Sequence, residues 1–340
     1  MGKKRLSAEA AAETESPTKG LPSVPERLQA VFHILWLMTK DDTPTFVVPN
    51  SIFGLSGALA STALITSSAT ITFPTVLCRV PLVLLFNWSN LLIFDLANQR
   101  LPESAAEDSL NKPWRPIPSG LMTCTQFRQC MLFAIPLVLL FNHLFLNTGT
   151  ETIYLYTLTW LYNDLKGGDE GWIFRNVIIA FAFGFYNLGS LKVAAGSAEI
   201  PKGDITITSA GYAWLVVISL VVLTTMHVQD LKDVAGDAAR GRRTAPIVLG
   251  DLPARLTIAI PVLFWTLYCA FFWRMGWLCG GGVGLLGAWV AWRCVALRGK
   301  DTRTDRKTWQ LWCAWTAVVY LMPARPSNLM RFVSACGLLL

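Results

Sequence analysis

Charged residues are scarce in this sequence. Only 15% of its 340 residues are Asp, Glu, Lys or Arg, whereas soluble domains average about 25%. The mean hydropathy is +0.44, and several apolar runs approach the ~20 residues that a helix needs to cross a bilayer. The formal charge of +7 lies in loops rather than on a basic face interleaved with aromatic residues. These features predict a multi-pass membrane protein that binds the lipid bilayer and no nucleic acid.

Motifs for zinc and nucleotides are also missing. The eight cysteines form no Cys-x-x-Cys pair and there are only three histidines, which argues against a zinc site. No Gly-x-x-x-x-Gly-Lys-Ser/Thr phosphate loop occurs. The stretch before Glu26 is too polar for the apolar core of a signal peptide. We expect residues 1–25 to be a disordered cytosolic tail and residues 26–340 to form the transmembrane domain.

Long apolar runs dominate the rest of the chain. They predict nine spans, near residues 46–65, 73–94, 124–145, 152–165, 173–191, 208–226, 256–273, 278–297 and 309–333, after an amphipathic interfacial segment at 26–40. Lys and Arg collect in alternate loops such as 100–123 and 229–255, and loops 66–72 and 142–151 contain none. The positive-inside rule then places the N-terminus in the cytosol. The expected fold is an all-α bundle of about nine transmembrane helices in the endoplasmic reticulum membrane.

Three acids follow the sixth predicted span. Asp230, Asp233 and Asp237 have the spacing i, i+3, i+7, which a helix would place on one face. Such neighbours repel unless a cation lies between them, and Mg²⁺ prefers carboxylate and phosphate oxygens. Asp95, Lys112, Arg115 and Lys166 fall on the same cytosolic side of the predicted topology. This mixture of acids and bases suits a diphosphate bridged by Mg²⁺. Two other interpretations are a solvated helix end beside a basic loop and a transporter of an anionic lipid.

Three motif regions resemble those of the UbiA superfamily of intramembrane prenyltransferases. Residues 230–246 read Asp-x-x-Asp-x-x-x-Asp, then Gly-Arg-Arg-Thr and Pro, nearly residue for residue as in the family's second Asp-rich motif. Residues 111–120, Asn-Lys-Pro-Trp-Arg-Pro-Ile-Pro-Ser-Gly, resemble the loop after its first motif, and Tyr162-x-x-x-Lys166 resembles its diphosphate-contacting element. The resemblance implies a bundle of nine transmembrane helices with a central cavity.

The first motif departs from the family pattern Asn-x-x-x-Asp-x-x-x-Asp. Asp95 matches the middle position, but neutral Gln99 stands where the last Asp belongs, and Asn90 is one place from the expected Asn. The continuation, residues 94–104, resembles fungal UbiA-type terpene cyclases. That resemblance implies an Mg²⁺-dependent class I cyclase that ionises farnesyl diphosphate and forms a sesquiterpene in secondary metabolism. The alternative is a UbiA-type transferase that moves a prenyl group to an aromatic or other small acceptor.

The resemblance also suggests a role for each candidate residue. The catalytic acids would be Asp95, Asp230, Asp233 and Asp237; the metal ligands Asp95, Gln99, Asp233 and Asp237; and the residues that bind the diphosphate Asn90, Gln99, Lys112, Arg115, Tyr162 and Lys166. Simpler interpretations exist for some of them. Asn90 could cap a helix end, Arg115 could be a positive-inside anchor, and Tyr162 with Lys166 an interfacial pair. The sequence gives no sign of an obligate protein partner.

Overall fold

The computed structural model describes residues 23–60, 63–67, 71–196, 205–298 and 301–324. The chain divides into two units, residues 1–36 and 37–340, and each is considered by itself. In the first, helix α1 (Val24–Thr39) exposes the apolar side chains of Leu28, Phe32 and Trp36. The helix begins at Val24 and so includes the last two residues of the predicted tail. Residues 1–22 of that predicted tail lie outside the described residues.

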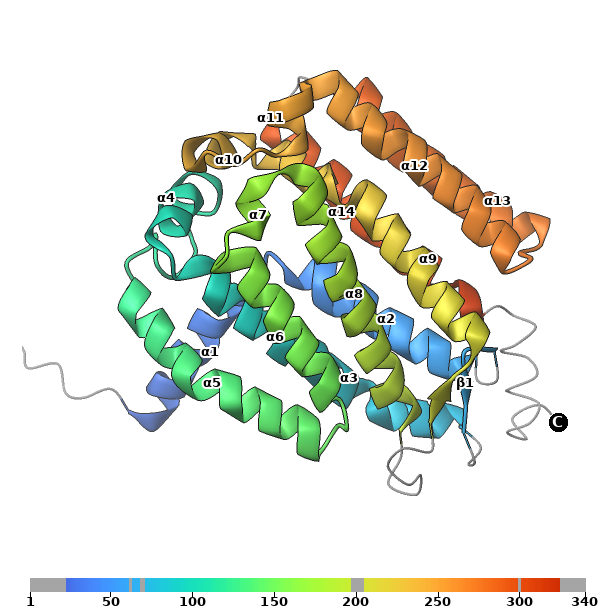
Figure 1. Ribbon diagram of the computed structural model, residues 1–340, viewed down its shortest axis with the longest axis horizontal. Helices are drawn as coiled ribbons and strands as arrows, with labels where there is room; N and C mark the ends of the chain where they lie inside the picture. The colour runs from blue at the N-terminus through green and yellow to red at the C-terminus, as the bar shows by residue number, and fades with distance from the viewer. Residues whose placement is uncertain (1–22, 61–62, 68–70, 197–204, 299–300, 325–340) are drawn as a thin grey trace, which may run out of the picture. The chain divides into compact units, whose positions relative to one another are not determined.

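The second unit contains a helix at the position of each predicted span (Figure 1). These helices are α2 (Thr43–Leu59), α3 (Phe73–Gln99), α5 (Cys124–Leu144), α6 (Gly149–Asn163), α8 (Trp172–Ala195), α9 (Ser209–Thr225), α12 (Asp251–Phe272), α13 (Trp277–Ala296) and α14 (Thr302–Leu321). Within the described residues, six are long and apolar enough to cross a membrane: α3, α5, α8, α9 with its extension to Lys232, α12 and α13. The predicted count of nine is therefore not confirmed. Helices α2 and α6 have only 17 and 15 residues, and α14 begins with a charged turn. The end of the last predicted span, residues 325–333, lies outside the described residues.

A small sheet interrupts the all-helical pattern that the sequence predicts. Strand β1 (Ile65–Thr66) pairs antiparallel with β2 (Thr206–Ile207), with Ile65 opposite Ile207. The first predicted span consequently ends at Leu59 rather than at Ile65. β-Branched residues suit extended backbone, and Thr208 reinforces the pairing by donating its backbone N–H to the carbonyl of Leu64 at 3.0 Å.

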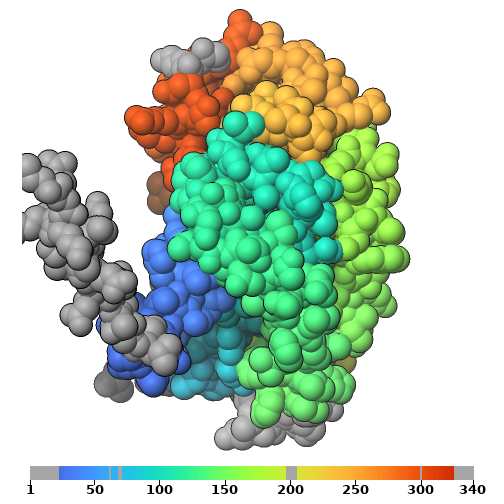
Figure 2. Space-filling model, turned by 90° about the vertical axis from the view of Figure 1, so that its left-hand side faces the viewer, coloured from blue at the N-terminus to red at the C-terminus, as the bar shows by residue number. Residues whose placement is uncertain are grey.

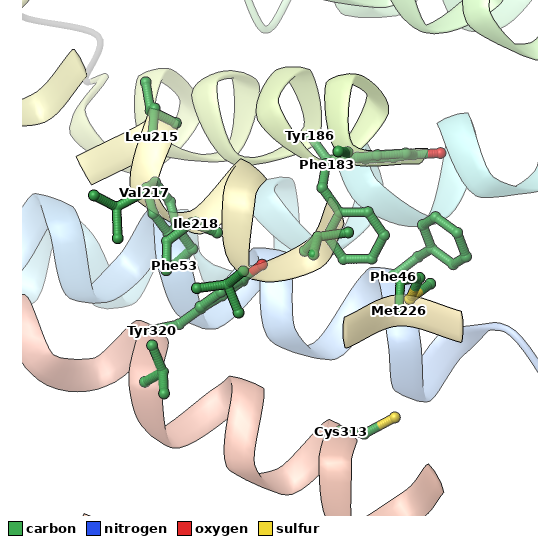
Figure 3. Packing of buried hydrophobic residues seen from close by; sticks show 14 of the residues in the cluster. Phe46, Phe53, Phe183, Tyr186, Leu215, Val217, Ile218, Met226, Cys313 and Tyr320 are labelled. Carbon is green, nitrogen blue, oxygen red and sulfur yellow. The ribbon is translucent and has the colours of Figure 1, made fainter. Parts of the chain in front are cut away.

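Close helix contacts build the core of this unit. At Gly54 on α2, a Cβ would lie 2.5 Å from the backbone carbonyl carbon of Ser190 on α8, so only glycine allows this approach. Figure 3 shows aromatic side chains of α2, α8 and α14 in the core of this unit. The rings of Phe46 and Phe183 are 5.0 Å apart, and those of Phe53 and Tyr320 meet edge to face at 5.4 Å.

Short helices gather at one end of the bundle (Figure 1). They are α4 (Pro102–Asn111), α7 (Gly167–Glu170), η2 (Met226–Lys232), α10 (Val234–Arg240) and α11 (Ala245–Leu249), while η3 (Met322–Ala324) follows α14. Asn111 ties α4 to α10, because its side chain donates to the carbonyl of Asp233 at 3.1 Å and accepts from the N–H of Gly236 at 3.2 Å. In Figure 2 the teal segment around α4 accordingly lies beside the orange segment that includes α10. The segment that follows the first Asp-rich stretch is thus joined to the second Asp-rich stretch itself.

Candidate functional site

A pocket at this end of the bundle encloses about 980 Å³, part of it open to solvent. Its wall has a charged part and an apolar part, contributed by helices from both halves of the chain. The charged part consists mainly of Asp42, Glu107, Asp108, Lys112, Arg115, Arg175, Lys232, Asp233, Asp237 and Arg242. The apolar part includes Phe46, Phe94, Leu155, Leu158, Ile178, Ile179, Ala182 and Tyr186.

The acids of the second motif do not share one helix face. Asp230 belongs to the 3₁₀ helix η2, Asp237 belongs to α10, and Asp233 is the capping residue between them, so the single helix predicted for all three is wrong. Each acid has a basic partner instead: Asp230 pairs with Arg175 at 2.6 Å, Asp233 with Lys232 at 2.5 Å and Asp237 with Arg242 at 3.3 Å. These ion pairs relieve the repulsion that a shared helix face would have caused.

Arg115 is the centre of a second charged cluster. Its Nη1 donates to both carboxylate oxygens of Asp108 at 3.0 Å. Its Nη2 lies 2.5 Å from Oδ2 of Asp42 and 3.8 Å from Oδ1 of Asp95. Gln99 reaches the same acid from α3 and donates its side-chain N–H to Oδ1 of Asp95 at 3.2 Å. One guanidinium is therefore surrounded by three carboxylates from α3, α4 and the start of α2.

Burial and charge act in opposite directions on the acids that lie outside the spans. Burial alone would raise the pKa of Asp42, but Lys112 and Arg115 hold it down to about 2. Burial likewise opposes Lys232 and Lys112 at Asp233, where the bases prevail and the pKa is lowered. At Asp237 burial prevails over Arg175 and Arg242, and the pKa is raised. Asp42 and Asp233 are therefore the firmly ionised acids among these three.

The unpaired oxygens of the site fit a divalent cation. Asp95, Asp230 and Asp237 each keep one buried oxygen, Oδ2, without a hydrogen-bond partner, which is costly unless a ligand satisfies it. In the part of the chain that the structure describes, no group of three or more His, Cys, Asp or Glu side chains is placed to hold a metal. Mg²⁺ commonly takes one or two carboxylates and completes its shell with substrate phosphates and water. The residues present fit Mg²⁺ held together with a diphosphate.

Comparison with known sequences agrees with this arrangement. The sequence model of the UbiA prenyltransferase family matches residues 52–315. The chain belongs to the UbiA family. It is 31% identical to a diterpene cyclase of Hericium erinaceus, over 80% of this chain and 81% of that one. It is 32% identical to a polyprenyl transferase of the same organism, over 65% and 70%, and 28% identical to the fumagillin beta-trans-bergamotene synthase of Aspergillus fumigatus, over 71% and 74%.

The fold is also similar to that of a solved UbiA homolog. A UbiA homolog from Archaeoglobus fulgidus, solved bound to DMAPP and Mg²⁺, superposes with a TM-score of 0.57 and 12% sequence identity, over 90% of this chain and 98% of that one. The predicted membership of the UbiA superfamily is thus confirmed, and so is the predicted similarity to fungal terpene cyclases. This UbiA-family chain therefore has both cyclases and a transferase among its relatives.

The structure brings some predicted diphosphate-binding residues of this UbiA-family chain to the pocket and leaves others outside. Lys112, Arg115 and Tyr162 line it, and the Tyr162 hydroxyl accepts from Nε of Arg175 at 2.9 Å. Asn90 is buried and donates its side-chain N–H to the carbonyl of Phe86. The Lys166 side chain is 61% exposed and pairs with Glu103 at 3.2 Å. Of the bases in the described pocket wall, Lys112 is the one without an ion pair.

Sequence analysis missed Asp42, Asp108, Arg175 and Lys232, all of which line the pocket of this UbiA-family chain. Arg175 had a usable signal, because it is a charge at the start of an apolar span, where ionisable residues are usually functional. Asp42 lies between the predicted amphipathic segment 26–40 and the first predicted span, where an acid has no pattern that marks it as functional. Asp108 lies in a polar loop with several other acids, and spacing alone does not distinguish it from them.

The two lysines predicted to bind diphosphate should respond differently to substitution. Lys112→Ala should raise KM for a prenyl diphosphate roughly 10-fold or more, because it removes the unpaired pocket base and its charge-assisted bond to phosphate. Lys166→Ala should change KM by less than about 3-fold, since exposed ion pairs contribute little. Steady-state kinetics of both variants in lipid nanodiscs, with circular dichroism to check folding, make the comparison. Equal losses would place the diphosphate near both lysines and contradict the prediction.

Proposed function

We propose that this chain is a membrane-bound, Mg²⁺-dependent terpene cyclase that ionises farnesyl diphosphate and cyclises its tail to a sesquiterpene. The observation that carries the proposal is the divided wall of a single pocket. Acids and bases that suit a metal-bridged diphosphate line the same pocket as apolar side chains that suit a hydrocarbon tail. The same site residues that the family resemblance implies are proposed here as catalytic: Asp95, Asp230, Asp233 and Asp237.

The charged part would hold and activate the head group. Mg²⁺, when bound, would act as a Lewis acid that neutralises charge on the leaving diphosphate. Asp233 and Asp237 line the pocket and would be its protein ligands, with Asp95 as a further ligand from α3. Lys112 has no competing ion pair, so its ammonium can bind a diphosphate oxygen directly. Arg175 orients the Tyr162 hydroxyl at the boundary between the two parts of the wall.

The apolar part would hold the tail and protect the cation that forms when diphosphate leaves. Aromatic rings line this part and contact one another. The ring centroid of Phe94 lies 5.8 Å from that of Phe46 and 5.5 Å from that of Tyr162, and the centroids of Phe46 and Tyr186 are 5.8 Å apart. Aromatic faces attract a cation, more strongly when water is excluded. An allylic cation surrounded by rings would react with a double bond of its own chain rather than with water, and the cyclised cation would then lose a proton to the released diphosphate to give the hydrocarbon. This is the chemistry of a cyclase.

Transfer to a small acceptor is the second candidate function. It shares the ionisation step, and the identity of 32% to a polyprenyl transferase favours keeping it. The two functions differ in whether diphosphate release needs an acceptor. Support for the cyclase comes from the similarity to two fungal cyclases and from the altered first motif.

We also propose the topology that the sequence predicts. Residues 26–340 would form the membrane domain in the endoplasmic reticulum, with the tail and the pocket mouth facing the cytosol. The support is that α4, α10 and α11 belong to two of the predicted loops in which Lys and Arg collect, 100–123 and 229–255, as the positive-inside rule requires for cytosolic loops.

Turnover of a single substrate tests the function. Membranes that contain the chain should convert farnesyl diphosphate alone to one volatile hydrocarbon, detected by headspace gas chromatography–mass spectrometry, and EDTA should abolish the product. Geranylgeranyl diphosphate, run in parallel, decides tail length. Diphosphate release that occurs only after aromatic acids are added would instead establish the transferase.

A further inference from the structure

Position 99 contributes no negative charge to the first Asp-rich motif, and its side chain faces Asp95 with a donor. The Gln99 amide N–H groups donate to the carbonyl of Met38 at 2.9 Å and to Oδ1 of Asp95 at 3.2 Å. Two acceptors fix this orientation of the amide, so its oxygen points elsewhere and is buried without a partner. Gln99 thus joins Asp95 to the chain segment that leads into α2.

That segment carries an acid of its own. Asp42 lies one helical turn beyond Met38 and precedes α2, but its side chain makes no capping hydrogen bond to the helix. Its carboxylate instead faces the pocket, where Arg115 Nη2 lies 2.5 Å away. The carboxyl groups of Asp42 and Asp95 also lie within hydrogen-bonding reach of each other. Two acids from different helices therefore meet beside Gln99.

Such a meeting requires a positive charge or a proton between the two groups. Buried carboxylates at this range cannot both stay ionised without a counterion. Arg115 supplies only part of that charge, since Nη1 is committed to Asp108 and Nη2 is 3.8 Å from Asp95. The second oxygen of Asp95, whose side chain is 0% exposed, has no partner at all. Oδ2 of Asp42 and Oδ1 of Asp95 both lie near Nη2 of Arg115, and together with the unsatisfied Oδ2 of Asp95 they are oxygen ligands of the kind that a small divalent cation prefers.

We propose that Asp42 supplies the carboxylate that position 99 lacks, and that Asp42 and Asp95 together form the first divalent-cation site of this chain. The inference rests on the proposed metal-dependent function and adds a ligand to it. It assigns Gln99 a supporting task, which is to hold Asp95 against the segment that carries Asp42. The second acid of this site then precedes α2, whereas in the family pattern it belongs to the motif on α3.

A charge exchange between positions 42 and 99 tests the proposal. Mn²⁺ binding is measured by the electron paramagnetic resonance signal of the free ion, on full-length protein in nanodiscs with inorganic pyrophosphate as the probe. Asp42→Asn should weaken one Mn²⁺ site roughly 10-fold or more, in the range seen when metal-site partners are removed. The double variant Asp42→Asn/Gln99→Asp should regain most of that affinity, because the carboxylate returns to the other side of Asp95.

The control removes an Asp–Arg pair of similar geometry elsewhere. Asp305 binds Arg255 at 2.7 and 2.9 Å and does not line the pocket, so Asp305→Asn should leave Mn²⁺ binding unchanged. Thermal unfolding and size-exclusion profiles identify variants that fail to fold. If folded Asp42→Asn binds Mn²⁺ as the wild type does, or if Gln99→Asp brings no recovery, the proposal is overturned. If the wild type makes a hydrocarbon but folded Asp42→Asn binds Mn²⁺ as the wild type does, this inference alone is overturned. If Asp42→Asn weakens Mn²⁺ binding but the wild type makes no hydrocarbon, the cyclase function alone is overturned.

Discussion

Asp233→Asn is expected to reduce turnover of a prenyl diphosphate by at least about 100-fold while the protein still inserts and folds. Asp233 lines the pocket, is ionised and lies between η2 and α10. Loss of a metal ligand should cost about 3 kcal/mol of transition-state stabilisation, which corresponds to roughly two powers of ten in rate. Single-turnover product formation, measured over a range of Mg²⁺ concentrations, gives both the rate and the metal requirement.

The asparagine variant keeps the size of the side chain, so loss of rate can be separated from loss of fold. Asp251→Asn is the matched control, because its carboxylate is half exposed and pairs with Arg255 away from the pocket. It should keep the wild-type rate. Wild-type turnover in folded Asp233→Asn would contradict the assignment of Asp233 as a metal ligand.

Gly54→Ala is expected to destabilise the fold. The new methyl group would come within 2.5 Å of the backbone of Ser190, and backbone cannot rotate away as a side chain can. Helices α2 and α8 would have to separate, and overpacking of this kind commonly costs 1–3 kcal/mol or more. The thermal midpoint in detergent and the yield of monodisperse protein should both fall.

Gly281 provides the control for that change. It lies within helix α13, where an added Cβ meets nothing within 4 Å. Gly281→Ala should leave the midpoint unchanged or raise it, since alanine favours helix by about 1 kcal/mol over glycine. A neutral Gly54→Ala would mean that α2 and α8 pack less closely than the structure describes.

Hydropathy located the helices well because a membrane span needs a long apolar run, and that requirement is written directly in the sequence. It did less well at helix ends. Leu59 ends α2 where continued apolar sequence predicted six more residues, since Ile65 and Thr66 pair with a strand more than a hundred positions away. It also predicted spans at α2 and α6, which have only 17 and 15 residues and are not among the six helices long and apolar enough to cross a membrane in the described residues, so the count of nine stays a prediction.

The residues of the site could largely be predicted from the sequence, but the ion pairs and contacts between them could not. The Asp and Lys/Arg residues of three motifs were found from spacing and resemblance, and Lys112, Arg115, Tyr162, Asp233 and Asp237 do line one pocket. The partners were not found. That Arg175 pairs with Asp230, or that Asp42 meets Asp95, depends on how α8 and α2 pack, and a linear sequence carries no local signal of such a meeting. Aromatic residues show the same limit: Trp214 and Trp315 are wholly buried in the core, while Tyr186 reaches the pocket.

The tie between Asn111 and Gly236 has a consequence for engineering. A Cβ at position 236 would lie 2.1 Å from Nδ2 of Asn111. The residue at position 236 must therefore be compatible with the residue at position 111. Product specificity in such a pocket is an obvious target for exchanging segments among relatives. The loop after the first motif and the second motif itself should be transplanted as a pair, because either one alone would lose the contact between Asn111 and Gly236.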